Sequence, residues 1–274
     1  MYALYPGRMP VKYALLVHLA VMLTGLSCRQ RDVLHEARKA INQGRPGDAR
    51  MYLQKALHNN TAAHTRAALL LMLANTYALH LGEPRRAMQV YRQLISSDPE
   101  TPEALEGRLR LAELLRYHTD DLRGAIAELT AARAQDASRA AELSYEIANI
   151  YFELENYEQC ALETAQLMKT HTTGPWGAKI LFLHAEALSM LKGRQADAKR
   201  TFATVVSRFP SSKLKSNALY ELGRFAFEAG EMARAIQYWV EALEKHPTPA
   251  VIQTSIARAR SRLHATTPAD TSAR

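Results

Sequence analysis

The sequence predicts an all-α protein, a right-handed superhelical solenoid of about six helical hairpins closed by a C-terminal capping helix. Good helix formers such as Ala, Leu, Arg, Glu and Gln dominate its 274 residues, and the 12 glycines and 11 prolines fall at intervals. Small residues recur with a period of 35–38 residues. Such a period is typical of stacked helical units, because no unit can bury its apolar face alone.

The hairpins follow from three positions that recur in each second helix. A small residue is followed four positions later by a large apolar or aromatic residue in most units, and three positions after that by another apolar residue. These spacings place the three side chains on one helix face. The six small residues are Ala49, Ala87, Ala125, Cys160, Ala198 and Ala235.

Turn residues separate the two helices of each hairpin. Glycine holds this position in four units, at Gly44, Gly82, Gly193 and Gly230. Glycine ends a helix readily because it adopts the left-handed conformation at little cost. Asp120 and Glu155 take the glycine position in the remaining two units.

The predicted solenoid domain spans residues 28–264. An amphipathic cap at its end turns Val251, Ile252, Ile256 and Leu263 inward, and a polar tail over residues 265–274 is expected to be disordered. The repeats and the cap cover about residues 30–60, 62–99, 103–136, 139–171, 176–210, 214–247 and 249–264.

The first residues carry the features of a secretory signal. Arg8 and Lys12 precede an apolar run over residues 13–26. This run of 14 residues is shorter than the roughly 20 that a membrane-crossing helix needs. A signal peptide over residues 1–27 is therefore favoured over a retained anchor.

The segment Leu23-Thr-Gly-Leu-Ser-Cys28 resembles a bacterial lipobox. Ser27 fits the small position before the cysteine, whereas Gly25 and Leu26 depart from the common pattern of Leu followed by a small residue. The resemblance implies a diacylglyceryl group on the sulfur of Cys28 and cleavage just before it. Ordinary secretion is the alternative.

A lipid on the new amino terminus would place the chain in the cell envelope, facing the periplasm. Two or more acyl chains give stable membrane attachment. Arg29 and Gln30 follow the cysteine, so the Asp that retains lipoproteins at the inner membrane in some bacteria is absent. This favours the outer membrane, while Met1 and Met9 both stay open as the start.

Composition narrows the functional classes. The formal net charge is +8, but no basic run exceeds a pair such as Arg85-Arg86, so solvated helix faces are favoured over a nucleic-acid site. Two cysteines are too few for a disulfide framework, and Cys160 is expected to be buried and inert. HExxH, CxxC and Gly-rich phosphate-loop motifs are absent, so neither catalysis nor a metal or cofactor is predicted.

The stretch from Ala218 to Pro247 resembles the tetratricopeptide repeat (TPR). A Leu222-Gly223 pair lies in its first helix; its second helix carries Ala235, Trp239 and Ala242 before the closing proline. The resemblance implies a concave groove, lined by first helices, that binds proteins or peptides. Their positions within the repeat predict that the following residues line this groove: Asn75, Glu113, Arg116, Tyr117, Tyr145, Asn149, Phe152, Tyr220, Arg224 and Phe227.

The run from Ala198 to Tyr238 is similar to the envelope branch of this family. That branch includes the lipoprotein of the outer-membrane barrel assembly machinery and the Tol–Pal coordinator. The resemblance implies a lipid-anchored adaptor for envelope proteins, in outer-membrane protein assembly or envelope maintenance. The alternative is an accessory lipoprotein of a solute transporter that binds a small ligand or a transporter subunit.

Overall fold

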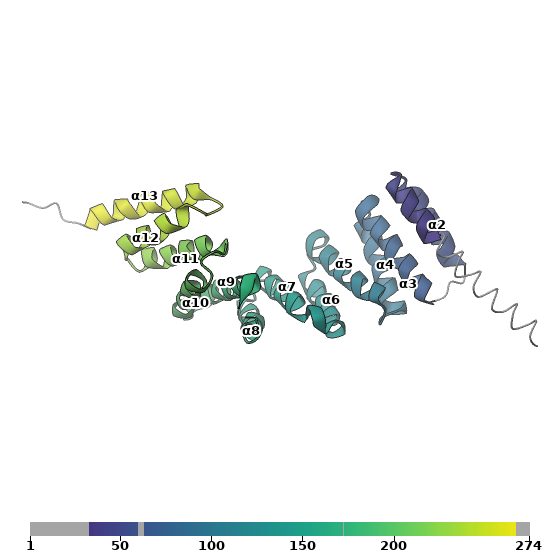
Figure 1. The fold of residues 1–274 in the computed structure, drawn as a ribbon, viewed down its shortest axis with the longest axis horizontal. Coiled ribbons are helices and arrows are strands. Elements are labelled where there is room, and N and C mark those ends of the chain that lie inside the picture. Colours follow the sequence, from purple (N-terminus) through teal and green to yellow (C-terminus); the bar gives the residue numbers. More distant parts are fainter. Residues whose placement is uncertain (1–32, 60–62, 172, 267–274) are drawn as a thin grey trace, which may run out of the picture. The chain divides into compact units, whose positions relative to one another are not determined.

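The computed structural model describes residues 33–59, 63–171 and 173–266. These ranges contain helices and turns and no β-strand (Figure 1). The helices pack as consecutive pairs along the chain, so the predicted all-α hairpin solenoid is confirmed. The predicted signal over residues 1–27 and the lipidation site Cys28 lie outside the described residues.

The chain divides into two compact units, residues 1–135 and 136–274. The division falls where the spacing of the small residues is shortest, 35 residues from Ala125 to Cys160 against 37 or 38 elsewhere. The helices of unit 1 are residues 33–42, α2 (Pro46–His58), α3 (Ala63–Asn75) continued by the π-helical turn η1 (Thr76–His80), α4 (Pro84–Ser97), α5 (Pro102–His118) and α6 (Leu122–Gln135).

Unit 2 opens with a short 3₁₀ turn and continues with three hairpins and a last helix. We call the first helix of a hairpin its A helix and the second its B helix. The elements are η2 (Ala137–Arg139), α7 (Ala140–Glu153), α8 (Tyr157–Met168), α9 (Gly174–Met190), α10 (Gln195–Arg208), α11 (Leu214–Glu228), α12 (Met232–Leu243) and α13 (Pro249–Thr266).

The B-helix positions that define the repeat form the core. All six small residues are fully buried, and the large residues that follow them, such as Tyr91 and Phe202, are buried as well. Small side chains at these positions let the two helices of a hairpin approach closely. The positions that recur in the sequence are therefore the ones that pack in the core. Cys160 is buried and unpaired, and burial raises the pKa of its thiol to about 12.

The turns between A and B helices are left-handed in every hairpin. The four glycines and the two substitutes, Asp120 and Glu155, have φ between +55° and +80°. The next residue donates its backbone N–H back to the last turn of the A helix, as Asn156 does to the Tyr151 carbonyl at 2.9 Å. This bond satisfies a carbonyl that the ending helix would otherwise leave unpaired.

The capping helix α13 buries two of the four side chains that the sequence predicted to face inward, Ile252 and Ile256, and leaves the other two exposed. Ile252, Ile256 and Ala259 are buried against α11 and α12, whereas Val251 is 47% and Leu263 is 37% exposed. Val251 lies beside the row of buried side chains that Ile252, Ile256 and Ala259 form, and it is not part of that row. Leu263 follows the row, but α13 has 18 residues against 12 in its partner α12, so its end extends past that helix.

Candidate binding groove

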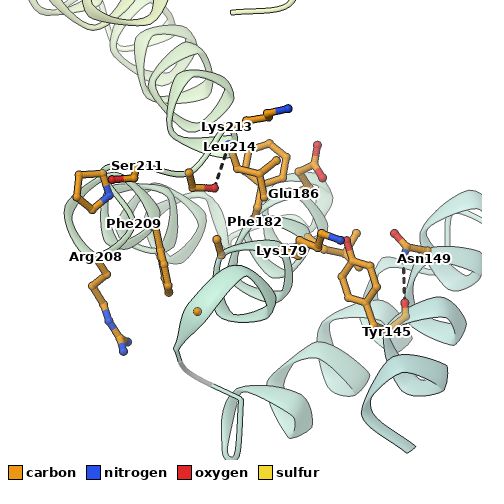
Figure 2. A pocket seen from close by; sticks show the side chains of 15 residues that line it. Tyr145, Asn149, Lys179, Phe182, Glu186, Arg208, Phe209, Ser211, Lys213 and Leu214 are labelled. Atoms are coloured by element: carbon orange, nitrogen blue, oxygen red, sulfur yellow. Dashed lines mark hydrogen bonds between the residues drawn. The ribbon is translucent and has the colours of Figure 1, made fainter. Parts of the chain in front are cut away.

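A groove of about 770 Å³ lies in unit 2, along the A helices α7 and α9. The segment that joins α10 to α11 forms its other side, and Figure 2 shows side chains from both sides facing the groove. Its lining is largely apolar, with Ala178, Phe182, Leu183, Phe209, Pro210 and Leu214.

The position of α9 explains why a groove forms here. This helix contacts α7 on one side and α11 on the other, so the A helices of three successive hairpins lie next to one another. Ala178, Phe182 and Glu186 follow at four-residue intervals, which places them on one face of α9. That face looks into the groove.

The segment between α10 and α11 closes the groove because α10 cannot continue through it. Pro210 follows the end of α10, and Ser212 Oγ accepts a hydrogen bond from the Leu214 N–H at 3.2 Å as α11 begins. This turn holds Phe209 and Leu214 at the groove wall.

Polar side chains enter the groove from α7. The amide of Asn149 donates a hydrogen bond to the Tyr145 carbonyl at 3.0 Å, one turn back. Burial raises the pKa of the Tyr145 hydroxyl, and its ring packs edge-on against Trp176 with centroids 5.5 Å apart. The Lys179 ammonium lies over the same indole, 5.1 Å from its centroid. Tyr145, Trp176 and Lys179 therefore pack together beside the groove.

Glu186 is the acidic residue among the residues that line this groove. Its carboxylate forms no hydrogen bond or ion pair within the described part of the chain, although the side chain is half-buried. Burial, with the nearby charge of Glu221 adding repulsion, raises its pKa to about 7. The carboxyl group therefore changes its charge near neutral pH.

A second recess of about 440 Å³ lies between α11, α12 and α13. The guanidinium groups of Arg258 and Arg262 lie over the ring of Phe227, 5.4 and 4.4 Å from its centroid. Arg224 forms ion pairs with Glu221 at 2.8 Å and with Glu228 at 3.5 Å. The aromatic walls are Tyr220, Phe227 and Trp239.

The predicted groove residues separate into groups in the structure. Tyr145 and Asn149 line the groove, and Tyr220 and Arg224 line the recess. Phe152 lies in neither site; its ring packs edge-on against Tyr157, with centroids 5.2 Å apart.

In unit 1, the predicted residues have other surroundings. Asn75 accepts a hydrogen bond from the Tyr91 hydroxyl at 2.5 Å, so it ties an A helix to its own B helix. Arg116 lies over the ring of Tyr117 at 5.1 Å, and Tyr117 is 67% exposed.

The sequence did not single out Glu186, although a signal was present. It directly follows Ala185, the small residue of its A helix, just as Asn149 follows Ala148. The repeat phase therefore places Glu186 where Asn149 stands in the preceding hairpin. Residue type obscured it, because a lone glutamate on a helix is ordinarily a solvated surface residue.

The described residues contain neither a cluster of metal ligands nor a membrane-spanning helix. Within residues 33–59, 63–171 and 173–266, no three His, Cys, Asp or Glu side chains lie close enough together to hold a metal ion. In the same ranges no helix has the length and apolar character needed to span a bilayer.

Stacked hairpins with a groove along their A helices define a helical-repeat fold. The tetratricopeptide repeat family matches residues 68–101 and 192–249. These two segments therefore match tetratricopeptide repeats, and the second includes the Leu222-Gly223 pair and its partners. No curated protein sequence matches the chain.

Several solved structures share this fold. The C-terminal part of a TPR protein from Cytophaga hutchinsonii superposes with a TM-score of 0.64 at 14% identity, covering 86% of this chain and 92% of that one. A TPR protein from Parabacteroides merdae gives 0.52 at 15%, covering 84% and 98%. YrrB, described as a TPR protein with an unusual peptide-binding site, gives 0.53 at 16%, covering 76% and 97%. At these identities the likeness is one of fold.

Proposed function

We propose that this chain is a non-catalytic, lipid-anchored adaptor that faces the periplasm and binds other envelope proteins through the groove of unit 2. The TPR fold supports a binding role, and YrrB offers a structural relative described as having a peptide-binding site. The outer membrane is the proposed location, and outer-membrane protein assembly or envelope maintenance is the proposed process.

The groove is the observation that carries this proposal. Its apolar walls and its polar residues from α7 offer what an extended peptide needs, namely side-chain burial and hydrogen-bonding groups. Binding a client segment there would remove Phe209 and Leu214 from water, and apolar burial is the main driving force of association.

Photocrosslinking in cells tests the groove. A photoreactive phenylalanine analogue in place of Lys179 is expected to crosslink to a specific envelope protein, because this position lines the groove. The same analogue in place of Lys169 is the matched control, since Lys169 is exposed at the end of α8 and does not line the groove. Equal crosslinking from both positions would contradict binding in the groove.

Metabolic labelling tests the anchor separately. We expect radioactive palmitate to label the wild-type chain, and we expect Cys28→Ala to abolish the label because it removes the sulfur that would carry the lipid. Globomycin, which blocks the lipoprotein signal peptidase, is expected to cause accumulation of the uncut form. Wild-type protein that is secreted without label would exclude the lipid anchor.

The volume of the groove favours one alternative, an accessory lipoprotein of a solute transporter. A cavity of about 770 Å³ is within the range that small-molecule sites occupy. Native mass spectrometry separates the two functions. A small molecule bound at one copy per chain, lost when Phe209→Asp makes the wall polar, would favour the transporter role.

A further inference from the structure

The groove contains a charge that the rest of the protein does not neutralise. Glu186 lies on the face of α9 that also carries Phe182 and Leu183, and Leu214 lines the groove with it. A half-buried carboxylate among apolar side chains loses hydration, and this loss is unfavourable unless an opposite charge or hydrogen-bond donors replace the water. Within the described residues, no side chain or backbone group does so.

The groove has cations of its own, and none of them pairs with Glu186. The ammonium of Lys179 lies over Trp176 instead, 5.1 Å from the ring centroid. Several titratable and charged groups lie near Glu186 or line the groove with it. They are Tyr145 of α7, Cys160 of α8, Lys179 of α9, Arg208 at the end of α10, Lys213 just before α11, and Glu221 in α11.

We infer that the groove selects segments that place a lysine side chain, flanked by apolar residues, against Glu186. This inference rests on the proposed function, because it specifies which peptide the same groove accepts. The ammonium would supply the missing counter-charge and hydrogen bonds. The four-carbon stem of lysine would lie along Phe182 and Leu214, as long cationic side chains do on apolar surfaces.

Binding of such a segment is coupled to loss of a proton from Glu186. An ammonium pairs with the ionised carboxylate, and the free groove holds this group with a pKa of about 7. The carboxyl group is largely neutral at pH 6 and largely ionised at pH 8. The affinity for a lysine-bearing segment therefore rises across this interval, whereas a neutral segment shows no such rise from Glu186.

Calorimetric titration of the full chain with three model peptides tests the inference. Each peptide carries two Leu-Phe pairs around a central Lys, norleucine or Glu, with Gly-Ser flanks and blocked ends. We expect the Lys peptide to bind about tenfold more tightly than the norleucine peptide at pH 8. We expect this preference to shrink at pH 6 and the Glu peptide to bind most weakly.

Two variants test whether Glu186 causes the preference for the Lys peptide. Glu186→Gln keeps the size of the side chain and is expected to abolish both the preference for Lys and its pH dependence. Glu158→Gln removes the same charge from an exposed position on α8 and is expected to preserve both. Both variants should unfold at temperatures no lower than the wild type, because neither side chain supports a contact in the core.

The outcomes distinguish the inference from the function on which it rests. Equal affinity for the Lys and norleucine peptides, or a preference that survives in Glu186→Gln, would overturn the role of Glu186 and leave peptide binding intact. Failure of all three peptides to bind would contradict peptide binding in the groove and, with it, this inference.

Discussion

At the scale of single residues, Gly223 in α11 has the tightest surroundings of the glycines described. A Cβ atom at this position would collide with the indole ring of Trp239. Trp239 donates its Nε1–H to the Tyr220 carbonyl at 3.0 Å and packs against Phe227, with ring centroids 5.7 Å apart. A single methyl group at Gly223 would displace this ring and break both contacts.

We therefore expect Gly223→Ala to lower the free energy of unfolding by about 1–3 kcal/mol, the usual effect of overpacking a core. Urea unfolding followed by tryptophan fluorescence and circular dichroism measures the change. Gly47→Ala in α2 is the control, because nothing lies within 4 Å of its Cβ position, and no loss of stability is expected there. Unchanged stability of Gly223→Ala would mean that Trp239 is not fixed at this position.

Glu186 predicts a pH dependence of stability at the same scale. Its pKa is about 7 in the folded chain against an ordinary value of 4.5, so the folded state holds the proton more tightly. The stability that this adds is fully present below pH 4.5 and is lost as the pH rises through 7. Glu186→Gln should match the wild type near pH 4.5 and exceed it by on the order of 2 kcal/mol at pH 8.

Urea titrations of Glu186→Gln and wild type at several pH values check this expectation. Glu158→Gln accompanies them as the control, since an exposed glutamate gives no comparable divergence. A difference between Glu186→Gln and wild type that stays constant with pH would show that Glu186 is solvated in the folded chain.

At the scale of the helical hairpin, the two turns without glycine are weak points. Asp120 and Glu155 adopt φ values of 55° and 57°, where an L-residue with a side chain is strained. We expect Asp120→Gly and Glu155→Gly each to raise the free energy of unfolding by about 1 kcal/mol. Thermal and urea unfolding measure the gain.

The opposite change provides the control for these turns. Gly82→Ala introduces a side chain at φ 65° and should lower stability by a similar amount, although no atom lies within 4 Å of its new Cβ. Conformation, and not a steric clash, would then be the cause. Equal stability of the three variants and the wild type would indicate that these turns relax when their residue changes.

The hairpins could be predicted from the sequence because each depends on local spacing. The small residue, its apolar partners and the turn position all lie within one repeat, so Asp120 and Glu155 were correctly placed at glycine positions. The buried face of α13 could be predicted only in part, because Val251 and Leu263 fit an amphipathic pattern as well as the buried Ile252 and Ile256 do. The position and length of α12 decide which of them is covered.

The groove, too, could be predicted from the sequence only in part. The position within the repeat placed Tyr145 and Asn149 on the A-helix surface, and both line the groove of unit 2. It did not predict that the segment from Phe209 to Lys213 forms the opposite side, because this segment lies outside the repeated positions. The position within the repeat also predicted that Asn75 lines the groove, as Asn149 does. In the structure Asn75 accepts a hydrogen bond from Tyr91, which joins the two helices of its hairpin.

At the scale of the whole molecule, the groove and the recess both belong to unit 2. Every residue that lines either of them lies between Tyr145 and Arg262. The two core clusters beneath them also lie within residues 136–274. Because the stability of a repeat protein is close to a sum over neighbouring repeats, three hairpins with a capping helix should be sufficient for folding.

We therefore expect a fragment of residues 136–266 to fold on its own and to bind the same peptides as the full chain. Circular dichroism should show a cooperative thermal transition. A shorter fragment that starts at residue 173 is the control: it lacks α7 and α8, and with them Ala148, Cys160 and Ala161 of the core. It should lose cooperativity or aggregate. If the longer fragment also failed to fold, unit 2 would depend on unit 1 for its stability.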